Sequence, residues 1–391
     1  MVMISRKLLP PTKSFYLFGP RGTGKSTWLR TTYPNAKWFN LLRNAELFRL
    51  MQDPELFRKE VEALPHGSWV VLDEIQRYPA LLNEVHDLLS SSPKGKYNFV
   101  LTGSSARKLK RSGVNLMAGR AIQRKMFPFV STEVDLSHSI ESCLRFGTLP
   151  ECYLNETEQE KIEFLESYLD TYLREEIKEE ALVRKLEPFS RFLKVAALMN
   201  GQQANLANIS REAAVSRPTV QGYFEVLVDT LIGYWLPALQ NRAKIKESAH
   251  PKFYFFDPGV VRVLASKVRE PLSDIERGLQ LETLLLNEMR AYLSYQGKGG
   301  TLSFWRTPHG TEIDLIFEGA TQPKECIGFE IKSSPRWRSE YSKTLKELLD
   351  QGAIKQGYGI YLGGSPLKDG RVSVLNVQSF LKNLWSGKII S

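Results

Sequence analysis

The chain has 391 residues, of which 42% are hydrophobic and 25% charged, and its formal net charge is +10. This length and composition predict two or three globular domains, each with its own core. No apolar run approaches the ~20 residues that span a bilayer, which argues against a membrane protein. The first residues lack the apolar segment of a secretory signal and the three cysteines lack zinc spacing, so we expect a cytoplasmic location. The positive charge favours an anionic partner, namely nucleic acid.

The most informative stretch follows the apolar run Phe15–Phe18, which predicts a buried strand. Its glycines allow a tight turn, and a helical pattern follows. Backbone N–H groups of such a loop meet the positive end of the helix, where they bind a polyphosphate. We expect Lys25 to contact the β- and γ-phosphates of ATP and the Ser26 hydroxyl to be a ligand of Mg²⁺. The residues of this predicted phosphate-binding loop are Gly19, Pro20, Arg21, Gly22, Thr23, Gly24, Lys25, Ser26 and Thr27.

A second apolar run, Trp69–Leu72, ends in two carboxylates, Asp73 and Glu74. The run fits a central strand that is buried on both faces and whose C-terminal end lies at the nucleotide crevice. At about fifty residues after a phosphate-binding loop, this pattern predicts that Asp73 holds Mg²⁺ through water and that Glu74 polarises the attacking water.

A third predicted strand, Tyr97–Leu101, precedes Thr102 and Ser104, whose hydroxyls can bond the γ-phosphate or the water, although such residues are also ordinary in loops. The loop, the Asp-Glu strand end and the polar third strand together resemble the AAA+ ATPases. The resemblance implies a parallel-sheet domain that binds and hydrolyses ATP. It also implies an arginine finger at Arg120, acting within the chain or on a neighbouring copy. The alternative for Arg120 is a surface arginine or one that binds nucleic acid.

The middle of the chain is predicted to be helical. Apolar residues recur at three- and four-residue spacing over 161–200, with charged residues between them. Two short helices, a tight turn and a strand-like run over 206–236 predict a winged helix-turn-helix. Arg217, Thr219 and Gln221, at the start of the second helix, would then contact DNA. The alternative is that this module serves only for packing.

Residues 278–362 are predicted to form a helix, three strands, a helix and a strand. Asp314 lies in the second strand, while Glu330 and Lys332 share one face of the third. If these strands are neighbours, Asp314 and Glu330 can bind Mg²⁺ while Lys332 orients or activates a water, which suits attack on a phosphodiester. Glu282 on the first helix could complete the metal shell. The alternative is a strand with an alternating charged face whose carboxylates form ion pairs.

This pattern resembles the PD-(D/E)xK nuclease superfamily, whose core has the same order of elements and the motif Asp…Glu-x-Lys. The whole chain resembles a bacterial and archaeal family that joins an AAA-type ATPase to a C-terminal domain of unknown function with a restriction-endonuclease-like region. The stretches that carry this resemblance are Leu101–Ser105, Ala118–Arg120, Arg145–Glu151, Phe253–Gly259 and Thr311–Asp314.

The expected fold is therefore α/β, with three domains. An AAA+ P-loop domain with a parallel sheet is expected at residues 1–130, a helical region with the winged helix-turn-helix at 131–260, and a nuclease-like α/β domain at 261–391. The first functional hypothesis is an ATPase that uses ATP and Mg²⁺, acts on or with nucleic acid, and carries a candidate DNA-cleaving domain. The second is a nucleotide-dependent switch whose nuclease-like domain is inactive and binds DNA or protein. Self-association through Arg120 is compatible with both, and no membrane partner is expected.

Overall fold

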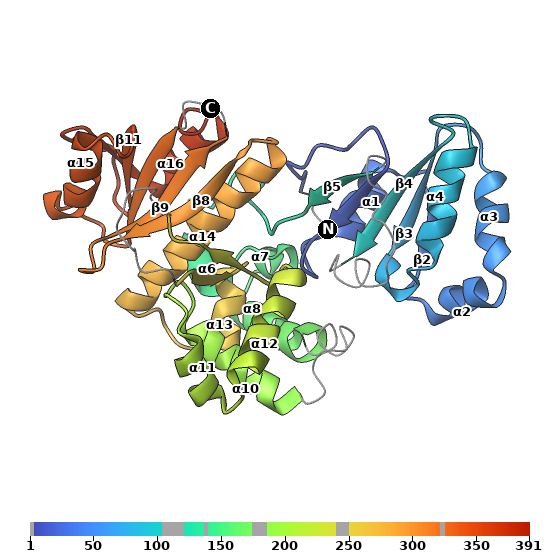
Figure 1. Cartoon of the computed structure of the whole chain (residues 1–391), viewed down its shortest axis with the longest axis horizontal. Coiled ribbons are helices and arrows are strands. Elements are labelled where there is room, and N and C mark those ends of the chain that lie inside the picture. Colours follow the sequence, from blue (N-terminus) through green and yellow to red (C-terminus); the bar gives the residue numbers. More distant parts are fainter. Residues whose placement is uncertain (1–3, 104–120, 137–139, 174–185, 240–249, 321–324) are drawn as a thin grey trace. The chain divides into compact units, whose positions relative to one another are not determined.

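The computed structural model describes residues 4–103, 121–136, 140–173, 186–239, 250–320 and 325–391. The chain divides into two compact units (Figure 1). The first, here called the N-terminal unit, comprises residues 6–128 and 229–232. The second, the C-terminal unit, comprises residues 1–5, 129–228 and 233–391, so the predicted helical and nuclease-like regions fall within one compact unit. The three predicted domain ranges themselves stay a prediction.

A five-stranded parallel sheet forms the N-terminal unit, in the order β2-β3-β4-β1-β5. Parallel strands need crossover connections, and from β1 to β4 helices supply them. The strands are β1 (Phe15–Phe18), β2 (Lys37–Asn40), β3 (Ser68–Asp73), β4 (Tyr97–Gly103) and β5 (Ile122–Lys125). The helices are α1 (Lys25–Thr32), α2 (Asn44–Gln52), α3 (Pro54–Glu62), the 3₁₀ turn η1 (Ile75–Arg77) and α4 (Leu81–Ser91).

Strand β1 is buried on both faces, as its unbroken apolar sequence predicts. Tyr16 and Phe18 belong to a core cluster that also contains residues of α3 and α4. Phe15 contacts the aromatic rings of Trp28 and Tyr33, at centroid distances of 6.4 and 6.1 Å. This two-sided packing fixes the end of β1, from which the predicted phosphate-binding loop leaves the sheet.

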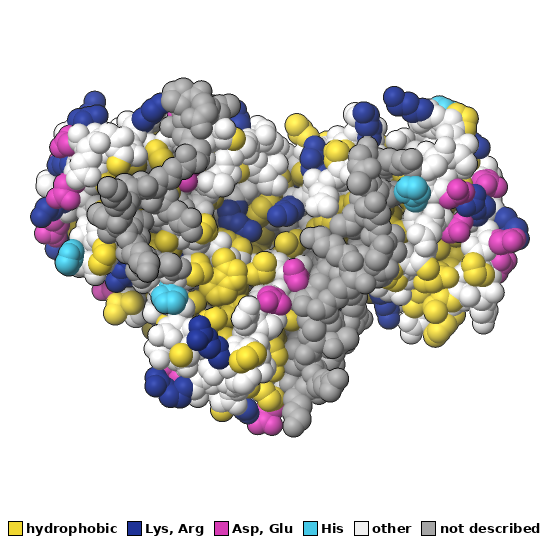
Figure 2. All heavy atoms as spheres, in the orientation of Figure 1, with side chains coloured by type: hydrophobic (Ala, Val, Ile, Leu, Met, Phe, Trp, Pro, Cys, Tyr) yellow, Lys and Arg dark blue, Asp and Glu magenta, His cyan; other side chains and the backbone are white. Residues whose placement is uncertain are grey.

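The surface of this unit also carries apolar side chains. Figure 2 shows them gathered over α2. Leu42, Phe48 and Met51 lie in and just before this helix, and they are 42%, 57% and 51% exposed.

The first part of the C-terminal unit is mainly helical, as predicted. Its two short strands, β6 (Gly233–Leu236) and β7 (Lys252–Phe255), pair antiparallel. Helices α11 and α12 and strand β6 occupy the residues for which two helices and a strand are expected, while the winged-helix fold itself stays a prediction. The helices are α6 (Ile140–Phe146), α7 (Pro150–Leu154), α8 (Glu158–Ser167), the π-helical turn η3 (Tyr168–Leu173), α10 (Leu186–Leu198), α11 (Leu206–Ala213), α12 (Arg217–Asp229) and α13 (Pro258–Leu264).

Two of the stretches that carry the family resemblance meet here. Asp257 is fully buried and caps α13 by accepting the N–H of Val260 at 3.2 Å, and it also accepts the N–H of Thr148 at 2.7 Å. Gly147 has φ 76°, and a Cβ atom there would lie 1.9 Å from Asp257 Oδ1. Glycine is therefore required at position 147, and Asp257 ties α6 to α13.

A six-stranded mixed sheet forms the rest of this unit, in the order β12-β13-β11-β10-β9-β8. The predicted order of helix, three strands, helix and strand occurs in it. The strands are β8 (Gly300–Arg306), β9 (Glu312–Gly319), β10 (Cys326–Lys332), β11 (Gln356–Tyr361), β12 (Leu367–Asp369) and β13 (Val372–Asn376). The helices are α14 (Asp274–Tyr295), the 3₁₀ turn η4 (Ser339–Ser342), α15 (Lys343–Asp350) and α16 (Val377–Trp385).

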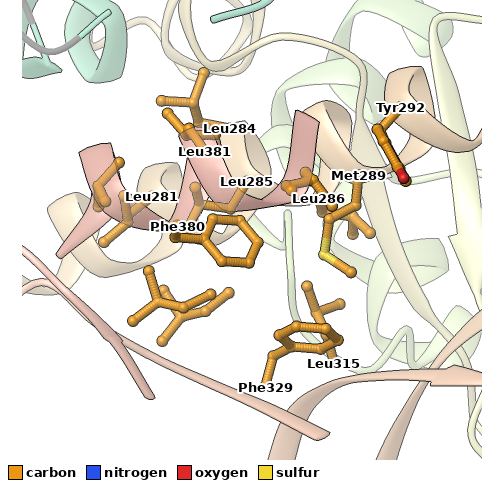
Figure 3. Packing of buried hydrophobic residues seen from close by; sticks show 14 of the residues in the cluster. Leu281, Leu284, Leu285, Leu286, Met289, Tyr292, Leu315, Phe329, Phe380 and Leu381 are labelled. Atoms are coloured by element: carbon orange, nitrogen blue, oxygen red, sulfur yellow. The ribbon is translucent and has the colours of Figure 1, made fainter. Parts of the chain in front are cut away.

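Helices pack on both faces of this sheet. Figure 3 shows Leu285 and Met289 of α14 and Phe380 of α16 packed near Leu315 of β9 and Phe329 of β10. A second cluster joins residues of α15 to the other side of the same strands. Among the described helices, none combines the length and the apolar character that a membrane crossing requires.

Candidate functional site

The predicted phosphate-binding loop connects β1 to α1. Gly22 and Gly24 have φ values of 81° and 88°, a region that glycine occupies without strain. A Cβ atom at Gly19 would lie 2.5 Å from the carbonyl oxygen of Met126, so a side chain there would collide with the backbone. The glycine spacing recognised in the sequence is therefore required by backbone geometry. Lys25, Ser26 and Thr27 are the first three residues of α1.

Lys25 points into this loop. Its side chain is buried, and Nζ donates hydrogen bonds to the carbonyl oxygens of Gly19 at 2.7 Å and Pro20 at 3.1 Å. The Thr23 hydroxyl donates to the same Pro20 oxygen at 2.8 Å, and an Arg6 N–H donates to the Thr23 carbonyl at 2.6 Å. The ammonium group is thus held over the loop beside the N-terminus of α1, where an anion is favoured.

Ser26 at the start of α1 meets Asp73 and Thr102, which lie at the ends of β3 and β4. Strand β4 lies between β1 and β3, so the end of β4 is brought beside both the loop and Asp73. Asp73 Oδ2 accepts a hydrogen bond from the Ser26 hydroxyl at 3.2 Å, and Asp73 Oδ1 accepts one from the Thr102 hydroxyl. The Asp73 and Thr102 side chains are both buried. A hydroxyl and a carboxylate side by side are oxygen ligands of the kind that Mg²⁺ binds, so these residues fit the predicted ion.

Glu74 occupies a special backbone position. It has φ 62° and ψ 51°, an uncommon region for a non-glycine residue, and it immediately follows β3. Its N–H donates to the Thr102 hydroxyl at 3.1 Å, and its carboxylate accepts a hydrogen bond from the Gln76 side chain. Thr102 therefore bonds both Asp73 and the backbone of Glu74. Ser104 and Arg120 lie outside the described residues.

A second cluster lies in the C-terminal unit and begins with a β-bulge. Ser303 of β8 pairs with Ile316 of β9, but Trp305 pairs with Ile313, so Asp314 and Leu315 stand opposite Phe304 alone. The pairing between β9 and β10 ends at Leu315 and Phe329. Beyond that point, the Asp314 carboxylate accepts the N–H of Ile331 at 2.7 Å. The bulge and the parting of the strands give Asp314 this place beside β10.

The structure brings Glu282, Asp314, Glu330 and Lys332 together. Lys332 Nζ lies 2.5 Å from Glu330 Oε1 and 3.7 Å from Asp314 Oδ2. Burial, and after it the Asp314 charge, raise the pKa of Glu330 to about 8 and that of Glu282 to about 7. Burial opposes protonation of Lys332, but the Asp314 and Glu330 carboxylates outweigh it and raise the pKa of Lys332.

Sequence reasoning missed two members of this cluster, both on β7. The Tyr254 hydroxyl donates to Glu282 Oε2 at 3.0 Å, and Tyr254 is fully buried. Lys252 is also buried and forms an ion pair with Glu312. Burial lowers the pKa of Lys252, but the charges of Glu282 and Glu312 outweigh it. The only sequence signal was the charge at the start of an otherwise aromatic strand.

The predicted metal role of this cluster stays a prediction. Its carboxylates are ligands of the right type, but Lys332 binds two of them. Among the residues that the structure describes, no three His, Cys, Asp or Glu side chains are grouped so that they could hold a metal ion. In this structure Lys332 forms ion pairs with Asp314 and Glu330, and Glu282 accepts the hydrogen bond of Tyr254.

Three family models match successive parts of the chain. Residues 11–134 match an AAA domain, residues 137–270 match a domain of unknown function (DUF8612), and residues 277–380 match another domain of unknown function (DUF4143). The uncharacterized protein MJ1544 of Methanocaldococcus jannaschii is 22% identical over 286 residues, and this match covers 66% of the chain and 62% of that relative.

One solved structure with detectable similarity is the DNA clamp loader delta protein (YqeN) of Bacillus subtilis. It is 12% identical, the match covers 70% of this chain and 95% of that one, and the TM-score is 0.25. A score this low supports no conclusion about fold or function. The family models carry more weight: the chain combines an N-terminal AAA domain with a C-terminal domain of unknown function (DUF4143).

Proposed function

We propose that the chain is a Mg²⁺-dependent ATPase whose nucleotide state controls a nucleic-acid-binding C-terminal part. One observation carries the proposal: Ser26, Asp73 and Thr102 are joined by hydrogen bonds beside the loop that holds Lys25. A hydroxyl, a carboxylate and an ammonium group beside a helix N-terminus are the groups that a nucleoside triphosphate requires. The match to an AAA domain over residues 11–134 supports the same activity.

The reaction is in-line attack of water on the γ-phosphate of ATP. Lys25 leaves its loop carbonyls and binds the β- and γ-phosphates, while the loop N–H groups bind the remaining phosphate oxygens. Ser26 and Asp73 would hold Mg²⁺, which when bound neutralises charge on the phosphates. Glu74 orients the attacking water, and Thr102 fixes the positions of Asp73 and Glu74. Arg120 is proposed as the arginine finger.

Charge and helix exposure support a nucleic-acid partner. The net charge of +10 raises the affinity for polyanions. Helix α12 begins with Arg217 and carries Gln221 one turn later, and both side chains are exposed, while Thr219 is half-buried. In the proposed DNA complex, these residues would contact base edges or phosphates from the start of the helix.

Phosphate release by a Glu74→Gln variant tests the ATPase proposal. We expect the variant to bind ATP as the wild type does and to lose turnover, because the amide cannot polarise water as a carboxylate does. Glu84→Gln is the matched control. Glu84 lies on α4 and forms an ion pair with Arg58 of α3 at 2.8 Å, and the variant should hydrolyse ATP at the wild-type rate. Wild-type turnover by Glu74→Gln would refute the assigned role.

The ion pairs of the second cluster favour a further candidate function. Lys332 pairs with Glu330 and Asp314, and burial raises the pKa of Glu330. Both effects compete with the binding of a metal ion by these carboxylates, which favours a C-terminal domain that binds DNA or protein without cleaving it. The chain would then be a nucleotide-dependent switch. Incubation of supercoiled plasmid with Mg²⁺ or Mn²⁺ separates the two hypotheses. Nicking by the wild type that Glu330→Gln abolishes supports a nuclease, whereas intact plasmid supports the switch.

A further inference from the structure

Strand β10 leads directly from Lys332 into a loop with two arginines. We infer that this loop, Ser333–Arg338, binds the sugar-phosphate backbone of DNA and directs it toward the cluster around Lys332. The inference rests on the proposed nucleic-acid function and names the residues that would make the contact. Arg336 and Arg338 are the proposed phosphate ligands, and Trp337 between them is the anchor.

The loop is held in one conformation by its own contacts. The Ser334 hydroxyl donates to the Arg336 carbonyl at 2.8 Å and accepts the Arg336 N–H at 3.2 Å. The Ser334 carbonyl accepts the N–H of Leu362 at 3.2 Å. Such a loop loses little conformational entropy on binding, which favours affinity.

Trp337 anchors the loop on the sheet. Its indole N–H donates to the Ser342 hydroxyl at 3.0 Å. A Cβ atom at Gly359 of β11 would lie 2.4 Å from the Trp337 ring, so the ring packs directly on the glycine backbone. With the tryptophan fixed, the two flanking arginines are displayed at the surface.

Both arginines are available to an external anion. Arg336 is exposed, and no carboxylate among the described residues pairs with it. Arg338 is 68% exposed, and it forms an ion pair with Glu340, which lies 3.4 Å away and is 65% exposed. An exposed pair of this kind contributes little free energy, so a phosphate can replace Glu340. The guanidinium fork suits two phosphate oxygens at once.

The loop is linked to the cluster by one aromatic ring. Lys332 Nζ lies 5.8 Å from the centroid of the Tyr341 ring, and the Arg338 guanidinium lies 5.9 Å from the same centroid. Trp337 also contacts this ring, at a centroid distance of 5.4 Å. A DNA strand carries a charge about every 3.4 Å along the helix axis, so a strand at Lys332 presents further phosphates to the loop. The arginines would offset the repulsion between these phosphates and the carboxylates beside Lys332.

The test is the salt dependence of DNA binding by the full chain. Anisotropy of a fluorescein-labelled 20-base-pair duplex would be measured in EDTA over a series of KCl concentrations for the wild type, Arg336→Gln and Arg338→Gln. The matched control is Arg371→Gln, because Arg371 is 62% exposed and pairs with Asp350 at 3.3 Å in the same unit. Each loop variant should make the negative slope of log K against log[KCl] shallower by about 0.9 and weaken binding roughly 8-fold at 100 mM KCl. The control should keep the wild-type slope.

Three results would overturn the inference. An equal loss of affinity and of salt dependence in Arg371→Gln would mean that Arg336 and Arg338 act only through the total charge of the protein. Unchanged slopes in both loop variants, with tight binding by the wild type, would show that the loop does not contact DNA, and the proposed function would still stand. An absence of DNA binding by the wild type at 50 mM KCl would overturn the inference together with the proposed nucleic-acid function. Unchanged melting temperatures would establish that the variants are folded.

Discussion

Thr102→Val tests whether the contact between the ends of β3 and β4 serves catalysis. Thr102 is fully buried, and valine keeps its shape while removing the hydroxyl. The change leaves Asp73 Oδ1 and the Glu74 N–H without this partner. Losing the partner of a buried polar group costs about 1–3 kcal/mol, so we expect the N-terminal unit to lose about 2 kcal/mol. At roughly 4 °C per kcal/mol, its melting temperature should fall by about 8 °C.

Catalysis should fall more than binding in this variant. Because Thr102 bonds Asp73 and the backbone of Glu74, we expect kcat for phosphate release to drop about 10- to 100-fold, or about 1.4–2.8 kcal/mol. ATP affinity, measured by titration with a fluorescent analogue, should change less than about threefold.

A buried threonine in the other unit provides the control. Thr283 is fully buried, accepts a hydrogen bond from Asn200 at 2.8 Å and donates one to the Leu279 carbonyl at 2.8 Å. Thr283→Val should cost similar stability and leave kcat unchanged. If Thr102→Val melts early but turns over ATP at the wild-type rate, the hydroxyl is only structural and the reasoning is refuted.

Three further predictions concern the C-terminal unit. Gly147→Ala should lower stability by about 3 kcal/mol because the new Cβ atom meets Asp257, and a wild-type melting curve would contradict this. Folding raises the pKa of Glu330 from 4.5 to about 8 and that of Glu282 from 4.5 to about 7. The unfolded chain therefore releases these protons at a lower pH than the folded chain does, so the free energy of unfolding falls as the pH rises from 4.5 to 8. Urea unfolding at pH 5 and pH 8 should show a smaller fall for Glu330→Gln, and an equal fall would refute the assignment. Tyr254→Phe should cost about 1 kcal/mol in urea by removing the donor to Glu282, and no loss would mean that this bond is not stabilising.

Local patterns in the sequence were enough to predict much of the N-terminal unit. The glycines of the loop need positive φ or close backbone approach, and the apolar run before them needs burial. The loop and the strand can therefore each be predicted from their own residues. The position of β4 between β1 and β3 could not be predicted in this way, because it depends on long-range strand pairing. The role of Thr102 toward the γ-phosphate or the water stays a prediction, and its hydrogen bonds to Asp73 and to the Glu74 N–H were not foreseen.

The C-terminal cluster shows the same division. Glu330 and Lys332 were expected on one face of a strand because their spacing fixes it. The bulge at Asp314 was not foreseen, since it arises from the mismatch between β8 and β9. Lys252 and Tyr254 were also missed, because strand β7 reaches the cluster from a part of the chain far away in sequence. Long-range packing, and not the local sequence pattern, therefore determines which charged side chains form the cluster.

Nucleotide binding at Lys25 is the central claim, and equilibrium dialysis with radiolabelled ATP and millimolar Mg²⁺ tests it most directly. The account predicts that the wild type binds ATP and that Lys25→Ala loses at least about 100-fold in affinity, because a buried ammonium group that can reach two phosphates is removed. Lys59→Ala, which removes an exposed partner of Glu55, should bind as the wild type does. Equal binding by the wild type and Lys25→Ala, or no binding by the folded wild type, would contradict the account.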